Sequence, residues 1–108
     1  MTENNLEIDS PLKRPLIIRS LKRSNIRKKI AEYLFEISPS YSYTSEIAYN
    51  VKTTPTNVIG AIRGMGVRYK QEESLISLNI IDEKQSRRNI RLYGLTNFGK
   101  EVIKSLNK

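Results

Sequence analysis

The dipeptide Thr54-Pro55 constrains the fold most, because it marks the start of a helix with unusual clarity. A threonine hydroxyl at the N-cap accepts a hydrogen bond from a free backbone N–H, and proline at the first helical position lacks only an N–H that would have no partner there. The helix that follows, at about residues 55–65, is amphipathic. Its expected inward ridge is Val58, Ile62 and Met65, and its outer side carries Thr56, Asn57, Gly60, Arg63 and Gly64.

A shorter helix precedes this one, and only a tight turn at Lys52-Thr53 separates the two. It begins near Ser42 or Thr44, and Glu46 falls in its first turn, where the helix dipole favours a carboxylate. Two short helices joined by a tight turn, the second with a polar and basic outer face, describe a helix-turn-helix.

Two more helices are expected before this motif. One starts near Pro15, and the next is capped by Ser24 and has apolar residues at spacings of three and four until Pro39. Leu16, Ile17, Ile18 and Leu21 of the first helix also allow two chains to pair, so a monomer and a homodimer both remain open.

Two β-rich runs after the motif, Ile80–Gln85 and Asn89–Leu95, predict a hairpin with Ser86-Arg87-Arg88 at its tip. Before it, Leu75, Ile76 and Leu78 should be buried in a helical turn that Asn79 ends, and Thr96 caps a last helix.

The order of these elements predicts a winged helix-turn-helix, which is mainly α with a small β-hairpin. We assign residues 12–108 to this one domain. Residues 1–11 are polar, acidic and without periodicity, so we expect a flexible tail there.

Composition excludes several classes of protein. The 108 residues include no cysteine and no histidine, which removes disulfides, thiolate or imidazole metal sites and the commonest general base. No run is apolar enough to span a membrane, and the N-terminus does not read as a secretory signal. We therefore expect a cytoplasmic, nucleoid-associated protein without a cofactor, and not an enzyme.

The charge is strongly positive and unevenly distributed. Lysine and arginine number 19 against 11 acids, a formal net charge of +8. Three stretches lack any acid: Lys13–Lys29, Lys52–Lys70 and Lys84–Arg91. One such stretch is as often a solvated face, but three together favour a polyanionic partner. No basic helix carries the opposite apolar face that membrane binding needs, so double-stranded DNA is the leading partner.

The helix that begins at Pro55 would then enter the major groove, and the basic wing, about residues 84–91, would lie on flanking DNA. Arg63 can grip a guanine edge and Asn57 an adenine edge. Gly60 costs stability in mid-helix, which close approach of DNA or of a neighbouring helix would offset. Phosphate or backbone contacts are expected from Tyr43, Lys52, Thr54, Thr56, Arg68, Lys70, Arg87 and Arg88, with capping alone the simpler role for Thr54.

Five segments, read in order, resemble the successive elements of archaeal winged helix-turn-helix transcription regulators: SNIRKKIAEYLFE, YTSEIAYNV, PTNVIGAIRGM, ESLISLNII and RLYGLTNFGKEVI. The stretch PTNVIGAIRGMGVRY running into SLISLNII looks most like the euryarchaeal regulators of archaellum operons. That resemblance implies promoter DNA and the transcription machinery as partners, and activation of archaellum genes.

Two features depart from the general pattern. The turn between the motif helices lacks its usual glycine, and residues 64–73 form a longer connection than is common. A protein of another class stays open: a winged-helix module whose same faces contact protein in a larger assembly. The acid-free faces argue against it, because the centres of protein interfaces are depleted in charge.

Overall fold

The computed structural model describes residues 13–66 and 69–106, with side chains described from Pro15 onward. The predicted tail, residues 1–11, therefore lies outside the described residues. The elements, in chain order, are α2 (Lys13–Arg23), α3 (Asn25–Ile37), β1 (Ser42–Tyr43), α4 (Thr44–Val51), α5 (Pro55–Arg63), the 3₁₀ turn η1 (Gln71–Glu73), β2 (Ile81–Gln85), β3 (Arg91–Leu95) and α6 (Asn97–Leu106).

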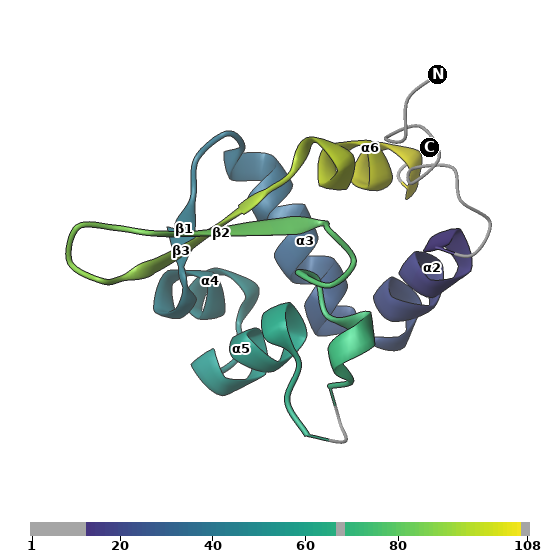
Figure 1. Ribbon diagram of the computed structural model, residues 1–108, viewed down its shortest axis with the longest axis horizontal. Coiled ribbons are helices and arrows are strands. Elements are labelled where there is room, and N and C mark those ends of the chain that lie inside the picture. The colour runs from purple at the N-terminus through teal and green to yellow at the C-terminus, as the bar shows by residue number, and fades with distance from the viewer. Residues whose placement is uncertain (1–12, 67–68, 107–108) are drawn as a thin grey trace.

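The described chain is a winged helix, mainly helical with one small antiparallel sheet, which confirms the predicted fold class. Figure 1 shows the β2–β3 hairpin projecting from the helices at the end of the molecule away from α2 and α6. The sheet has three strands in the order β1-β3-β2, so the prediction of a hairpin alone was incomplete. The added strand, β1, pairs Ser42 with Tyr93 and Tyr43 with Leu92.

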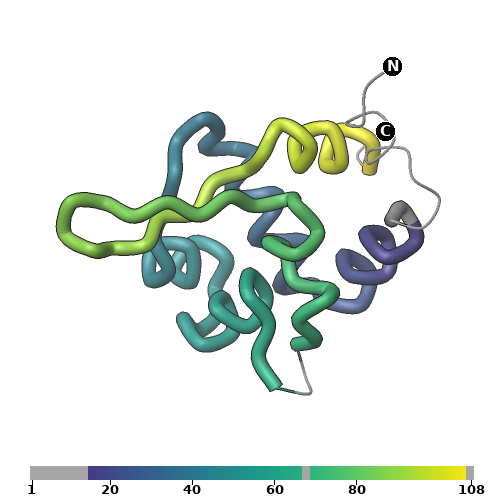
Figure 2. The backbone as a smooth tube through the Cα atoms, viewed as in Figure 1, coloured from purple at the N-terminus to yellow at the C-terminus, as the bar shows by residue number. Residues whose placement is uncertain are grey.

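The core gathers around α3, which lies between α2, α4, α5 and α6 in the tube of Figure 2. Ile30, Ala31 and Leu34 of α3 are fully buried. These helices have 8 to 13 residues. Helices of that length are marginal alone in water, so their stability comes from the faces they bury together, at about 1.5–3 kcal/mol for each large aliphatic side chain.

Side-chain caps fix where three of the helices begin. Ser24 Oγ accepts from the Arg27 amide at 3.2 Å, Thr54 Oγ1 from the Asn57 amide at 3.1 Å, and Thr96 Oγ1 from the Gly99 amide at 2.8 Å. All three predicted starts are confirmed.

The end of α5 differs from the prediction. The helix stops at Arg63, because Gly64 takes a φ of 91° and turns the chain away. Met65 is consequently 44% exposed and is no part of the inward ridge. Instead, its backbone exchanges two hydrogen bonds with Tyr69, at 2.7 and 3.2 Å.

The long connection from Gly64 to Ile80 packs closely against the helices. The amides of Leu75 and Ile76 donate to the carbonyls of Ala61 and Ile62, at 3.1 and 3.0 Å. Leu75 and Leu78 are buried as predicted. Asn79 takes a left-handed φ of 62°, as expected for a residue that closes a helical turn.

A buried ion pair anchors this connection. Arg27, which belongs to the acid-free stretch Lys13–Lys29, is 1% exposed. Its Nη1 lies 3.4 Å from Glu73 Oε1, and its guanidinium lies 5.6 Å from the centroid of the Tyr69 ring. Arg23 Nη1 adds a contact of 3.1 Å to Glu73 Oε2. The Ser20 hydroxyl also donates to the Glu73 backbone carbonyl at 2.6 Å, so three side chains converge on one buried glutamate.

Glu73→Ala should lower the free energy of unfolding by about 3 kcal/mol, because it leaves the Arg27 guanidinium buried without its carboxylate. Urea denaturation measures the change. Glu72→Ala removes the same charge from the neighbouring exposed position and should stay within about 0.5 kcal/mol of the wild type. Equal costs for the two variants would contradict an anchoring role for Glu73.

Candidate nucleic-acid interface

The outer side of α5 carries a stripe of three residues at helical spacing. Thr56 and Arg63 are exposed, and Ile59 between them is partly exposed. Val58 and Ile62 point the other way and are fully buried. These positions follow from spacings of three and four along a helix. The cationic, polar side of α5 therefore faces outward.

The turn into α5 contains Lys52 and Thr54, two of the residues predicted to contact phosphate. Lys52 closes α4 in the left-handed region, at a φ of 60°, where glycine is usual. The next amide, of Thr53, donates to the Ala48 carbonyl at 3.0 Å. The Lys52 side chain is exposed beside Thr54, the N-cap of α5. Lys52 thus lies two residues before the N-cap of α5, where Thr54 Oγ1 already accepts from the Asn57 amide.

Asn57 is held by intramolecular hydrogen bonds. Its Nδ2 donates to Thr53 Oγ1 at 3.0 Å, and its Oδ1 accepts from the Tyr69 hydroxyl at 3.5 Å. Reading an adenine edge uses both atoms of the amide. In this structure, both atoms instead brace the turn and the segment after α5.

Gly60 lies on the buried side of α5, so its predicted place on the outer side is wrong. A Cβ built on Gly60 would lie 2.5 Å from Cδ2 of the Tyr69 ring. Real Cβ atoms do not come so close to an aromatic carbon. The close approach that Gly60 permits is therefore to an aromatic ring of the protein itself and not to DNA.

The tip of the wing is a three-residue loop, Arg87-Arg88-Asn89. The Asn89 amide donates to the Ser86 carbonyl at 3.1 Å, and the Ser86 amide to the Ile90 carbonyl at 2.9 Å. Asn89 takes a left-handed φ of 61°, which a hairpin loop of this length requires at its third residue. Asn89 is thus part of the loop. The prediction that Asn89 begins the second strand was wrong. Arg87 and Arg88 are both exposed at the tip.

One face of the hairpin is covered by Tyr41. Its hydroxyl donates to Asp82 Oδ2 at 2.7 Å, and this hydrogen bond raises the pKa of the Tyr41 hydroxyl above its ordinary value. Lys84 Nζ lies 4.0 Å from the centroid of the same ring, and Gly94 leaves the space into which the ring fits. This face is therefore occupied by the protein's own loop.

The other face of the hairpin meets the end of α5. Arg63 Nη1 lies 3.1 Å from Glu83 Oε1, and Arg91 Nε lies 3.9 Å from Glu83 Oε2. The hydrogen bond to Glu83 raises the pKa of the Arg63 guanidinium, so it stays charged. Opposite Glu83 in the register is Tyr93, which is fully buried. Burial is the main cause that raises the pKa of the Tyr93 hydroxyl.

The remaining predicted residues are more scattered. Tyr43 is 45% exposed at the start of α4, and Lys70 is exposed at the start of η1. Arg68 lies outside the described residues. Sequence reasoning did not select Tyr49, which is 84% exposed on α4. It also passed over Glu83, which no motif marked.

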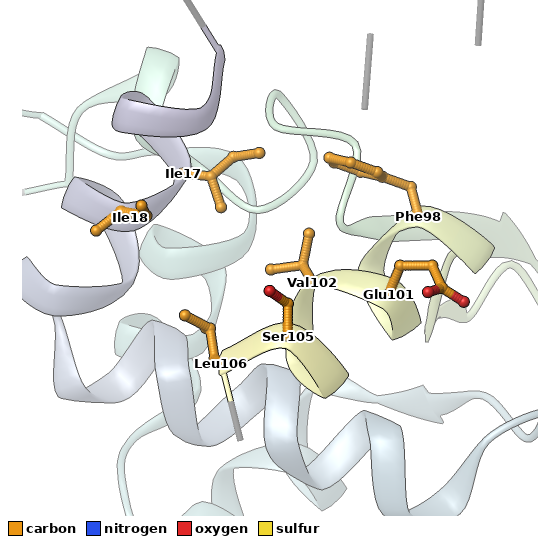
Figure 3. Close-up of a pocket in the computed structure, with 7 residues that line it drawn as sticks. All are labelled: Ile17, Ile18, Phe98, Glu101, Val102, Ser105 and Leu106. Carbon is orange, nitrogen blue, oxygen red and sulfur yellow. The ribbon is translucent and has the colours of Figure 1, made fainter. Parts of the chain in front are cut away.

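An apolar groove of about 230 Å³ lies between α2 and α6 (Figure 3). Both helices are at the end of the molecule away from the wing tip, so the groove is separate from the face formed by α5 and the hairpin. Its lining residues are Ile17, Ile18, Phe98, Glu101, Val102, Ser105 and Leu106.

Two negative findings apply to the described residues alone. Residues 13–66 and 69–106 contain no cluster of three or more acidic, histidine or cysteine side chains able to hold a metal ion. Within the same ranges, no helix has the length and apolar character needed to cross a membrane.

Comparison with known proteins identifies the family. Residues 17–106 match the family described as EarA-like. The chain belongs to the EarA-like family. An uncharacterized protein of Methanocaldococcus jannaschii, MJ0905, is 41% identical to it over 92 residues, which are 85% of this chain and 82% of that protein. This EarA-like protein therefore has a relative of similar length in an archaeon.

Solved structures share the fold. MepR, a transcription regulator of the Staphylococcus aureus multidrug efflux pump MepA, matches with a TM-score of 0.62 over 99% of this chain and 75% of its own, at 15% identity. A ZitR structure from Lactococcus lactis matches with a TM-score of 0.52 at 18% identity. That match covers 73% of this chain and 49%, about half, of the ZitR chain. At such identities the likeness shows the winged-helix fold of this EarA-like protein.

Gly60→Ala should lower the free energy of unfolding by about 1–3 kcal/mol, because the added methyl group has no room beside Tyr69. At a helical position with free space around the glycine, the same substitution should instead raise the free energy of unfolding by about 1 kcal/mol. Thermal or urea denaturation decides between them. On a Tyr69→Leu background the same change should cost less, and an unchanged cost would show that the Tyr69 ring is not the obstacle.

Proposed function

We propose that this EarA-like protein is a sequence-specific DNA-binding transcription regulator. In this proposal α5 enters the major groove and the hairpin lies on flanking DNA. The observation that carries it is the 3.1 Å contact between Arg63 of α5 and Glu83 of β2, which joins the outward-facing helix to the arginine-tipped wing. A helix and an adjacent basic hairpin then form one continuous surface.

The dimensions of α5 suit that role. Nine residues span about 14 Å, and an α-helix with side chains is about 10–12 Å across, close to the width of the major groove. Arg63 lies on the outer stripe, where it can donate two hydrogen bonds to a guanine edge. Thr56 lies two turns nearer the helix start, where backbone N–H groups suit a phosphate.

Phosphate contacts would come from both sides of α5. Lys52 and Thr54 flank its start, while Arg87 and Arg88 extend from the wing tip. Tyr43, Arg68 and Lys70 are proposed as further backbone contacts. Asn57 and Gly60 contribute by shaping the turn and the helix surface, since their contacts are with the protein itself.

The proposed target is promoter DNA of archaellum genes, with activation of their transcription and the transcription machinery as a second partner. The resemblance of the segment from Pro55 to Tyr69 to regulators of archaellum operons supports this target. In this proposal the protein acts in the cytoplasm at the nucleoid, by binding alone and without a catalytic step.

Arg63→Ala should reduce discrimination at one base pair by about 1–3 kcal/mol, because base contacts specify sequence. Arg88→Ala should instead weaken binding to every duplex alike, because a phosphate contact carries no sequence information. Fluorescence anisotropy with a duplex selected by the wild-type protein and with a mixed-sequence duplex separates the two effects.

The same titrations test the electrostatic part of the proposal. If six cations contact phosphates, the logarithm of the association constant should fall with the logarithm of salt with a slope of about −5. Unchanged discrimination in Arg63→Ala would reject its base-reading role. Absence of duplex binding even at low salt would favour a protein-interaction module instead.

We also propose that two copies associate through the groove between α2 and α6. Leu21, expected to be available for pairing, is buried in the protein's own core, whereas Leu106 at the groove is 41% exposed. A patch used by both copies suits a twofold dimer.

Sedimentation velocity of the full chain should accordingly show a dimer, which Leu106→Glu shifts toward monomer because it places a charge in the apolar contact. Tyr49→Glu, at an exposed position on α4, is the matched control and should not alter the sedimentation coefficient. A monomer at every micromolar concentration would contradict the dimer.

A further inference from the structure

We infer that Glu83 is a specificity-determining residue that acts through Arg63: its carboxylate holds the Arg63 guanidinium in the orientation that reads a base. The inference rests on the proposed function, because it assumes that α5 enters the major groove. It assigns a role to an acid that lies on an otherwise basic DNA-binding surface.

The geometry places Glu83 between the two parts of that surface. Its Oε1 is 3.1 Å from Arg63 Nη1, and its Oε2 is 3.9 Å from Arg91 Nε. One carboxylate therefore bridges the last residue of α5 and the first residue of β3. The side chains of Arg63 and Glu83 are 39% and 32% exposed, so the pair is open to a ligand without being fully solvated.

The pair lies next to Tyr93, which faces Glu83 across the hairpin and is fully buried. Burial is the main cause that raises the pKa of the Tyr93 hydroxyl, but Glu83 also raises this pKa and Arg63 lowers it, so both charges lie near the hydroxyl. Arg63 itself closes a helix that stops at Gly64. A long arginine side chain at a helix end has many rotamers, and a fixed acceptor on the neighbouring strand selects among them.

Holding Arg63 in this way leaves donors for DNA. A guanidinium has five N–H donors in a planar fork, and the contact with Glu83 engages Nη1. The remaining N–H groups suffice for the two hydrogen bonds that a guanine edge accepts. An arginine that is already oriented loses less conformational freedom on binding than one that is free, so the correct base gains more than an incorrect one.

A gain in affinity for DNA does not explain why residue 83 is a glutamate. A negative charge beside phosphates weakens binding to every duplex, whatever its sequence. An acid that lowers general affinity but fixes a base-reading donor raises the difference between correct and incorrect sequences. This distinguishes Glu83 from a residue that serves only to attract DNA.

The neighbouring residue provides a matched control. Asp82 carries the same charge on the same strand, but its carboxylate accepts from Tyr41 on the opposite face of the hairpin and makes no contact with Arg63 among the described interactions. Asp82→Ala therefore removes one negative charge from the wing without releasing Arg63. Glu83→Ala also removes one negative charge, and in addition it releases the Arg63 side chain.

The experiment measures binding of the full chain to two probes: a duplex selected by the wild-type protein from a random pool, and a mixed-sequence duplex. The readout is the dissociation constant for the mixed-sequence duplex divided by that for the selected duplex. It is measured for the wild type, Glu83→Ala, Asp82→Ala, Arg63→Ala and the double variant Arg63→Ala with Glu83→Ala. Thermal denaturation confirms that each variant is folded.

Glu83→Ala should lower the ratio about tenfold, toward the lower end of the range for one well-placed base contact. Binding to the mixed-sequence duplex should become tighter in Glu83→Ala and Asp82→Ala alike, while Asp82→Ala keeps the wild-type ratio. In the Arg63→Ala background, Glu83→Ala should leave the ratio unchanged, because Glu83 then has no arginine to orient.

A ratio that Glu83→Ala leaves unchanged, while Arg63→Ala lowers it, would overturn the inference and leave the proposed function in place. So would a fall in the ratio of equal size with and without Arg63. Full discrimination in Arg63→Ala would also overturn the inference, because Arg63 would then read no base. Failure of the proposed function looks different: the wild type would show no preference for any duplex, and this result would overturn both.

Discussion

The buried contact between Arg27 and Glu73 joins two segments that lie 46 residues apart, and the position of α5 depends on it. A buried ion pair adds little net stability compared with apolar side chains of similar size, but losing one partner is costly. Its effect is therefore to fix one arrangement. Glu73 sits in the connection after α5, and its backbone and carboxylate are held by α2 and α3. The connection is thereby fastened to the helical core, and its Tyr69 is placed over Gly60.

The anchored connection positions the proposed DNA-binding surface, which consists of α5 and the hairpin. The Tyr69 ring packs on the buried side of α5 and turns the stripe of Thr56, Ile59 and Arg63 outward. The connection then leads into β2, whose Glu83 meets Arg63. Tyr41 covers the opposite face of the hairpin. The hairpin is thus held from both sides near the start of β2, as the proposed DNA-reading surface requires.

Features that depend on residues close in the sequence could be predicted, and features that depend on contacts between distant segments could not. The caps Ser24, Thr54 and Thr96 each bond an amide three residues away, so a short sequence window contains the whole interaction. The arginine loop was predictable for the same reason. Strand β1 is only two residues long, too short for a periodic pattern, and it exists because β3 pairs with it. Burial of Arg27 and of Gly60 depends on Glu73 and Tyr69, which belong to a connection whose path no local pattern reveals.

The central claim is that the outer side of α5 and the wing tip together form the surface that binds duplex DNA. Amide chemical-shift mapping of the isotope-labelled chain, titrated with a selected duplex, tests this most directly. The account predicts that the largest changes fall on Lys52–Arg63 and Ser86–Arg91, while the groove between α2 and α6 changes little. Changes confined to α2 and α6, with α5 and the wing unaffected, would contradict it.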